Sequence, residues 1–113
     1  VGAAVLSADG QIFSGCNVEN ASYGLTICAE RAALIQAVAR GVREFRLVAI
    51  YTPTPMPTAP CGACRQFIRE FGDDIEVVSL CDGEAVLRTN IRDLLPIAFS
   101  RDSLSEDTAT GPV

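Results

Sequence analysis

The sequence predicts one α/β domain of the three-layer α/β/α kind, in which a mixed sheet of five strands lies between layers of helix. Short, β-rich apolar runs alternate with two helical patterns that begin near Cys28 and Cys61. This order is typical of strands joined by crossover helices. The last two apolar runs are joined only by a short turn at Cys81-Asp82-Gly83. That link is too short for a crossover, so we expect the last two strands to form an antiparallel hairpin.

Length and composition agree with a single globular domain. The chain has 113 residues, of which 49% are apolar and 20% charged, an ordinary balance for one domain. We assign residues 1–99 to this domain. Residues 100–113 are rich in Ser, Thr, Asp and Gly, and we expect them to be a mobile tail. No apolar run reaches the roughly 18 residues of a membrane span, so we expect no membrane partner.

The charge of the chain argues against a nucleic-acid partner, and its cysteine content indicates the redox state of its compartment. The net charge is −5, from 14 acidic residues and nine arginines, with no lysine and no histidine. Such a chain lacks the basic face that holds a phosphate backbone, so we expect no nucleic-acid partner. The five cysteines are an odd number, and no stretch has the pattern of a secretory signal. These features favour reduced thiols and a cytoplasmic protein over a disulfide framework.

The first third of the chain predicts a hairpin followed by a helix. Residues 2–6 have the apolar character of a buried strand, residues 8–10 mark a turn, and residues 11–14 return as the second arm. Residues 17–26 form a polar loop. An alanine-rich helix then begins at Cys28 and stops at Gly41, because glycine commonly ends a helix.

The middle of the chain predicts one strand and the second helix. Residues 45–51 are an apolar, β-rich run with helical connections on both sides, which suits the middle of a parallel pair. Residues 52–59 contain three prolines, so we expect an extended, stiff approach to the second helix. That helix begins at Cys61 and ends at Gly72.

The last elements are short. Residues 75–80 predict a strand, and residues 84–87 predict its antiparallel partner after the turn. Residues 91–95 predict a short helical turn that Pro96 breaks.

Three cysteines lie at the two predicted helix starts. Pro60 fixes the entry to the second helix, so Cys61 and Cys64 fall in its first turn, where unpaired N–H groups favour thiolates. A Cys-x-x-Cys alone serves either as a redox pair or as half of a zinc site. Cys28 supplies a third ligand for one zinc ion per chain, and a catalytic zinc keeps its fourth position for water. With no histidine in the chain, such a site must use thiolates or carboxylates.

Glu30 separates the catalytic interpretation from two alternatives. It follows Cys28 by two positions, close enough to handle the proton of a zinc-bound water without binding the metal. A thiol redox protein has no use for this carboxylate. A closed structural zinc site would need a fourth protein ligand. Cys16 and Cys81 lack ligand spacing, and we expect both to be small buried hydrophobic side chains.

The combined motifs resemble a known family. Cys-x-Glu at residues 28–30, followed by Pro-Cys-x-x-Cys at residues 60–64, resembles the signature of zinc-dependent nucleoside and nucleobase deaminases. With residues 15–23 and 94–99, the chain is similar to cytidine deaminases of the small, homotetrameric type. The resemblance runs from Val1 to about Phe99. This family usually has a helix before the first strand, so we expect that the given chain lacks that N-terminal helix.

The resemblance implies a reaction and a proton carrier. The reaction is hydrolytic deamination of cytidine and deoxycytidine to uridine and deoxyuridine with release of ammonia, as in pyrimidine salvage. Glu30 is the catalytic residue, and the backbone of Ala29 lies near the exocyclic amine. Arg31 is expected to donate hydrogen bonds to the thiolates. That withdraws charge from a zinc centre that three thiolates leave with a net charge of −1.

The resemblance also implies how the nucleoside is bound. Asn17 and Glu19 are two positions apart in an extended segment and therefore point the same way. Their amide and carboxylate suit ribose hydroxyls, and the family uses such residues for ribose. The resemblance places Tyr23 and Phe99 at the substrate pocket of adjacent subunits in a homotetramer with shared active sites.

Three alternatives remain open from the sequence. A blasticidin-type or other modified-nucleoside deaminase shares the zinc signature. An inactive zinc-binding module would keep the cysteines, although the intact Glu30 argues against it. A thiol redox protein would cycle its cysteines and need no metal.

Overall fold

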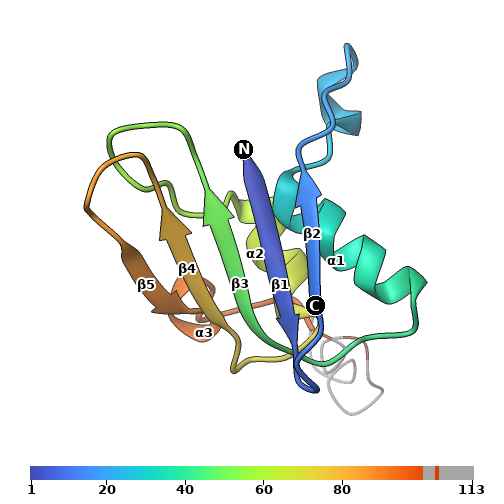
Figure 1. Ribbon diagram of the computed structural model, residues 1–113. Helices are drawn as coiled ribbons and strands as arrows, with labels where there is room; N and C mark the ends of the chain where they lie inside the picture. The colour runs from blue at the N-terminus through green and yellow to red at the C-terminus, as the bar shows by residue number, and fades with distance from the viewer. Residues whose placement is uncertain (101–103, 105–113) are drawn as a thin grey trace.

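The computed structural model describes residues 1–100 and 104. Its elements, shown in Figure 1, are β1 (Gly2–Ser7), β2 (Ile12–Cys16), the 3-10 turn η1 (Tyr23–Leu25), α1 (Ala29–Ala39), β3 (Phe45–Tyr51), α2 (Gly62–Arg69), β4 (Glu76–Leu80), β5 (Leu87–Asn90) and α3 (Ile91–Leu94). The tail predicted over residues 100–113 lies almost entirely outside the described residues. Within the described part of the chain, no helix is long and apolar enough to cross a membrane.

The five strands form one mixed sheet, as the sequence predicts. Their order is β2-β1-β3-β4-β5. Only β3 and β4 are parallel, because α2 lies between them in the chain and carries the crossover. The pairs β1–β2, β1–β3 and β4–β5 are antiparallel. The predicted antiparallel pairing of the last two strands is therefore confirmed.

The position of the last strand differs from the sequence prediction. The prediction placed it at residues 84–87, whereas β5 spans Leu87–Asn90 and its first pair joins Leu87 to Ser79. Residues 81–86 form a loop instead. The backbone N–H of Asp82 donates to the carbonyl of Thr54 at 2.9 Å, so this loop contacts the segment before α2 and delays the start of the strand.

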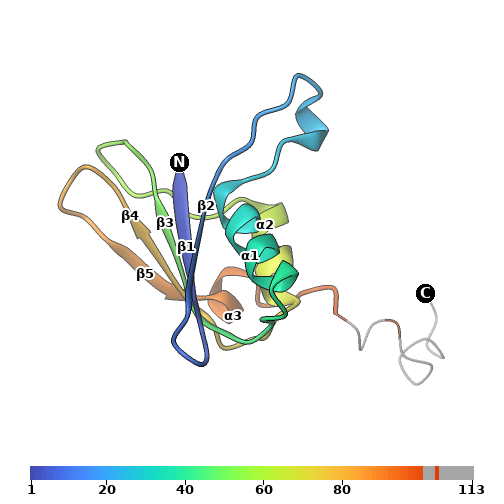
Figure 2. The ribbon, with the colours of Figure 1, turned by 45° about the vertical axis from the view of Figure 1, so that its right-hand side comes forward.

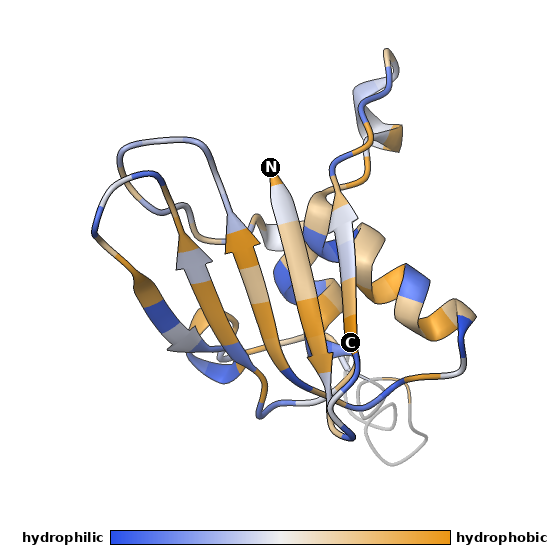
Figure 3. Ribbon diagram, in the orientation of Figure 1, coloured by the Kyte–Doolittle hydropathy of each residue, from blue (hydrophilic) through white to orange (hydrophobic). Residues whose placement is uncertain are grey.

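The helices lie on one face of the sheet. Figure 2 shows α1, α2 and α3 together on the same side. The core fills the space between them and the sheet, and it joins Phe13 and Val48 of the strands to Leu34, Ile68 and Ile91 of the helices. In Figure 3 hydrophobic colours run along β1, β3 and β4. The sequence analysis expects a layer of helix on each face, whereas all the described helices lie on one face (Figure 2), so the second layer is not found among the described residues.

Candidate active site

The three predicted metal ligands meet at one point. The Sγ atoms of Cys28, Cys61 and Cys64 all lie within 4.8 Å of one another, and those of Cys28 and Cys61 are 3.8 Å apart. Cys28 stands at the start of α1, and Cys61 stands at the start of α2. Cys64 lies in the first turn of α2 and is fully buried. The fold therefore brings together thiols that are 33 positions apart in the chain.

The spacing and charge of these thiols fit a zinc ion. Zinc binds thiolate sulfur at about 2.3 Å in a tetrahedron, which places two sulfurs about 3.8 Å apart. Burial raises the pKa of the Cys64 thiol far above its usual range, with a smaller contribution from its hydrogen bond to Cys61. Burial also acts to raise the pKa of Cys61, but hydrogen bonds, first that from the Cys64 backbone, outweigh it and lower this pKa. A bound cation offsets the cost of burying a thiolate at Cys64, so the donor set suits a divalent metal.

Glu30 lies beside this thiol cluster in the first turn of α1. It is only 5% exposed. Its charge and its hydrogen bond are among the causes that raise the pKa of Cys64, after burial and the hydrogen bond to Cys61. Glutamate side chains are rarely buried in a protein core, so packing alone does not explain a buried carboxylate beside three thiols. Its position suits a group that moves protons at a metal centre.

Arg31 makes the sulfur contact that the sequence analysis expects. Its Nη2 donates to the Sγ of Cys28 at 3.5 Å and to the carbonyl of Thr26 at 3.1 Å. The hydrogen bond to Cys28 is the main cause that raises the pKa of Arg31. The guanidinium therefore stays charged next to the cluster. Its proposed effect on the acidity of the metal remains a prediction.

A pocket of about 260 Å³ opens beside the cluster. Among the predicted residues, Asn17, Glu19, Ala29 and Glu30 line it together with Cys28 and Cys61. The side-chain amide of Asn17 donates to the carboxylate of Glu19. This pair places an amide donor and a carboxylate acceptor side by side, which suits two neighbouring hydroxyl groups of a ligand.

The sequence analysis missed part of this lining. Ile50, Thr52 and Thr58 also face the pocket. Thr52 directly follows β3, and ligands of open α/β sheets commonly bind beyond the carboxyl ends of strands. This rule could have identified Thr52 as a pocket residue from the sequence. For Thr58, within a proline-rich segment, the sequence offered none.

Tyr23 and Phe99 do not line the pocket of their own chain. Tyr23 lies on an arm of residues 17–27 that projects past the end of β2 (Figure 1) and is closed by one bridge between Val18 and Ile27. Tyr23 is 88% exposed and Phe99 is 61% exposed. The carbonyl of Phe99 accepts from Nε2 of Gln66 at 2.6 Å. The structure thus leaves both aromatic side chains available to a neighbouring molecule.

Gly15 explains why α1 lies so close to β2. A Cβ atom at this position would lie 2.5 Å from the backbone nitrogen of Ala33 and 2.9 Å from the carbonyl oxygen of Ala29. Only glycine therefore permits the observed contact. The contact fixes the first turn of α1, which carries Glu30, against the strand that leads to Asn17.

The two remaining cysteines are not ligands. Cys16 was expected to be buried, but it is exposed. It ends β2, which lies at the edge of the sheet and pairs only with β1. Cys81 is half-buried, and its Sγ lies 3.5 Å from the carbonyl oxygen of Pro55. Neither belongs to the thiol cluster.

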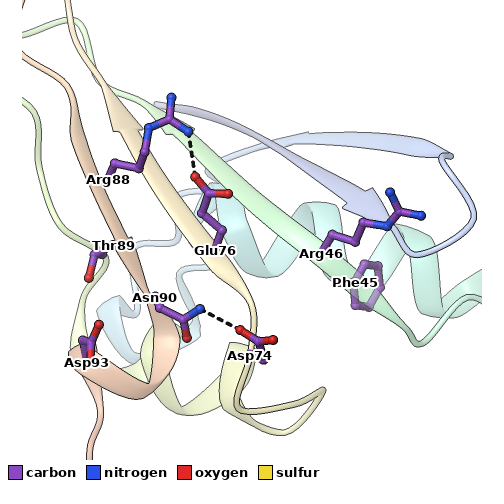
Figure 4. A pocket seen from close by; sticks show the side chains of 8 residues that line it. All are labelled: Phe45, Arg46, Asp74, Glu76, Arg88, Thr89, Asn90 and Asp93. Atoms are coloured by element: carbon purple, nitrogen blue, oxygen red, sulfur yellow. Dashed lines mark hydrogen bonds and ion pairs between the residues drawn. The ribbon is translucent and has the colours of Figure 1, made fainter.

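A larger cleft of about 620 Å³ lies at the opposite end of β3 and β4 (Figure 4). Several of its polar groups are paired with one another. Arg88 forms an ion pair with Glu76 at 2.6 Å, and the amide of Asn90 donates to Asp74 at 3.0 Å. The cleft contains no thiol. The thiol cluster, rather than this larger cleft, therefore marks the candidate active site.

Comparisons with known proteins agree with this site. Residues 1–81 match the family model described as the cytidine and deoxycytidylate deaminase zinc-binding region. This stretch includes all three thiols of the cluster and Glu30.

Individual relatives show the same similarity. A cytidine deaminase from Sporosarcina psychrophila is 47% identical over 106 residues, which cover 93% of this chain and 78% of that protein. The crystal structure of cytidine deaminase from Burkholderia pseudomallei superposes with a TM-score of 0.83 at 52% identity, covering 87% of this chain and 80% of that one. A blasticidin-S deaminase from Bacillus cereus is 32% identical over 110 residues, 90% of this chain and 78% of that protein. With its thiol cluster and its fold, the chain belongs to the cytidine deaminase family.

Proposed function

We propose that this protein catalyses the zinc-dependent hydrolysis of cytidine and deoxycytidine to uridine and deoxyuridine with release of ammonia. The observation that carries the proposal is a pocket lined by two of the three clustered thiols, a buried carboxylate and a polar pair, with the third thiol, that of Cys64, buried in the same cluster. The thiols are Cys28, Cys61 and Cys64, and the carboxylate is Glu30. Cys28, Cys61 and Cys64 would hold one zinc ion per chain. Bound there, zinc supplies a Lewis-acid centre that makes a water molecule acidic near neutral pH.

Glu30 is the proton carrier in this proposal. Its buried carboxylate takes the proton that the attacking water loses and delivers it to the ring nitrogen next to the carbon that bears the amine. The proton that remains on the added oxygen then passes through Glu30 to the departing amine as the new carbonyl forms. Water and cytidine thus yield uridine and ammonia. The low exposure of Glu30 supports this role, because a shielded carboxylate transfers protons without exchange with bulk water.

Other residues of the chain bind and orient the nucleoside. Asn17 and Glu19, which line the pocket, bind the ribose hydroxyls. The backbone of Ala29 lies near the exocyclic amine. Arg31 withdraws charge from the sulfur ligands through its contact with Cys28, and this offsets the low acidity of a metal bound by three thiolates.

The proposal includes a homotetramer with shared active sites. The described residues that line the pocket of one chain include no aromatic side chain against which a pyrimidine ring could stack. Tyr23 and Phe99 lie outside it with exposed side chains. Exposed aromatic side chains add little to the stability of an isolated subunit. In an assembly each would close the pocket of a neighbour. The reduced thiols of the site also support a cytoplasmic location.

A substrate panel tests this function. The purified protein is mixed with cytidine, deoxycytidine, cytosine or blasticidin S, and the fall in ultraviolet absorbance and the ammonia released are followed with and without a chelator. We expect rapid, chelator-sensitive release from the two nucleosides and little from cytosine. A preference for blasticidin S would replace the proposed substrate with a modified nucleoside. No ammonia from any compound in the zinc-loaded protein would indicate an inactive binding module.

A further inference from the structure

The segment that delivers Cys61 has little structure of its own. Residues 52–60 connect β3 to α2 without a helix or strand. Pro53, Pro55, Pro57 and Pro60 lack backbone N–H groups, so this segment has few donors with which to hold its shape. Its internal hydrogen bonds all involve Thr54, which contacts Thr52 and the carbonyl of Met56. Yet it lines the pocket and ends at a metal ligand.

Contacts with the β4–β5 connection hold this segment in place. The N–H of Thr52 donates to the carbonyl of Leu80 at 3.1 Å, and the N–H of Asp82 donates to the carbonyl of Thr54 at 2.9 Å. The Sγ of Cys81 lies 3.5 Å from the carbonyl oxygen of Pro55 and 3.3 Å from that of Ala85 in its own loop, so its one proton has two acceptors within reach. Both Figure 1 and Figure 2 show the two connections side by side. We call residues 81–86 the 81–86 loop.

Gly83 lies where the two connections leave no room for a side chain. A Cβ atom at this position would overlap the carbonyl oxygen of Pro55 and would lie 3.4 Å from its carbonyl carbon. Gly83 is not among the glycines with positive φ, which are Gly10, Gly41 and Gly72. The backbone conformation of Gly83 is therefore open to other residues. The need for glycine comes from the contact with Pro55 alone.

We propose that the 81–86 loop is a positioning element for the metal centre, with Gly83 as its positioning residue. A side chain at Gly83 has to displace Pro55, and the stiff proline-rich segment transmits that shift to Cys61 and the pocket wall. Groups that orient metal ligands from outside typically cost about 10- to 100-fold in metal affinity or activity when they are changed. The inference rests on the proposed zinc site, but it does not depend on the substrate.

The test is the rate at which zinc leaves the protein. Zinc-loaded parent and Gly83→Ala are mixed with a chelator that changes colour on binding zinc, and release is followed at neutral pH. We expect Gly83→Ala to release zinc about tenfold faster, within the range seen for residues that support ligands. Its KM for cytidine should rise more than its kcat falls, because the pocket wall moves while Glu30 on α1 does not.

Two further variants keep the test decisive. Glu84→Ala removes an exposed side chain from the same loop and should release zinc at the parent rate. Cys81→Ala removes the sulfur contact with Pro55 without adding bulk, so it should fold even where Gly83→Ala does not, and it should release zinc a few times faster than the parent. Urea unfolding of the zinc-free proteins measures general stability separately.

Three results would overturn the proposal. The first is a folded Gly83→Ala protein that releases zinc at the parent rate. The second is Glu84→Ala releasing zinc as fast as Gly83→Ala. The third, if Gly83→Ala does not fold, is parent-like release by Cys81→Ala. Because release needs no nucleoside, a parent that binds zinc but does not deaminate cytidine would refute the proposed function and leave this result intact.

Discussion

The two sides of the pocket are built in different ways. On the side of the thiols, α1 is pressed against the sheet through Gly15, and Glu30 and Cys64 are buried. On the side where a nucleoside would enter, the arm of residues 17–27 is held near its base by the Val18–Ile27 bridge and by hydrogen bonds to Thr26, and Tyr23 is almost fully exposed. The difference suggests that one chain suffices to hold the metal and move protons. We propose that surface from a neighbouring chain helps to enclose the substrate, because Tyr23 and Phe99 are exposed outside the pocket of their own chain.

The largest expected effect lies on the buried side. Cys64→Ala removes a fully buried ligand and leaves only two thiols, so zinc and activity should be lost together. Stability should fall as well, because metal binding is coupled to folding. Elemental analysis should show near-zero zinc in the variant and one zinc per chain in the parent. Cys16→Ala, an exposed cysteine outside the cluster, is the matched control. Full zinc content in Cys64→Ala would contradict the ligand assignment.

Glu30→Gln should separate chemistry from metal binding. Glutamine keeps the shape of the side chain but cannot carry protons, so kcat should fall at least about 100-fold, the usual scale for general acid–base catalysis. Zinc content should stay at one per chain. Glu44→Gln changes an exposed carboxylate and should behave as the parent. Turnover of Glu30→Gln within a few-fold of the parent would assign the proton transfer to another group.

The exposed side is tested by mixing subunits. Phe99→Ala should lower kcat/KM for cytidine about tenfold, within the range of a base that loses an aromatic stacking partner. Ile97→Ala, at a 92% exposed position two residues away, should have little effect. Refolding Phe99→Ala together with inactive Glu30→Gln should restore activity in mixed assemblies, because some sites then combine an intact Glu30 with an intact Phe99. An active monomer by light scattering would rule out shared sites.

The smallest effect is expected at the ribose end of the pocket. Glu19→Ala should raise the KM for cytidine several-fold and leave that for free cytosine nearly unchanged, because only the nucleoside presents hydroxyls to this carboxylate. Glu19→Gln, which keeps a hydrogen-bond acceptor, should have a smaller effect. Equal changes for cytidine and cytosine would place Glu19 away from the sugar.

The sequence predicted elements whose signals are local. The helix starts at Cys28 and Cys61 were predicted from proline, glycine and apolar periodicity. Because the ligands lie at these helix starts, the local signals were enough to predict which thiols form the cluster. The start of β5 was misplaced because residues 81–86 form a loop that contacts Thr54 and Pro55 before the strand begins. Such contacts join segments distant in the chain and leave no local pattern. Cys16 was expected to be buried from residue type alone, whereas its place on an edge strand decides its exposure.

The helix starts themselves have a consequence for folding. Cys28 and Cys61 occupy the N-cap positions of α1 and α2, where sulfur, a weak hydrogen-bond acceptor, takes the place of the usual side-chain oxygen. A serine or aspartate there would typically contribute about 1 kcal/mol to each helix. Both helices give up that stabilisation, and both thiols face one point. A cation bound there would link the N-termini of α1 and α2 through Cys28 and Cys61. The amides of both first turns should then exchange with solvent faster, and together, whenever the metal is withdrawn.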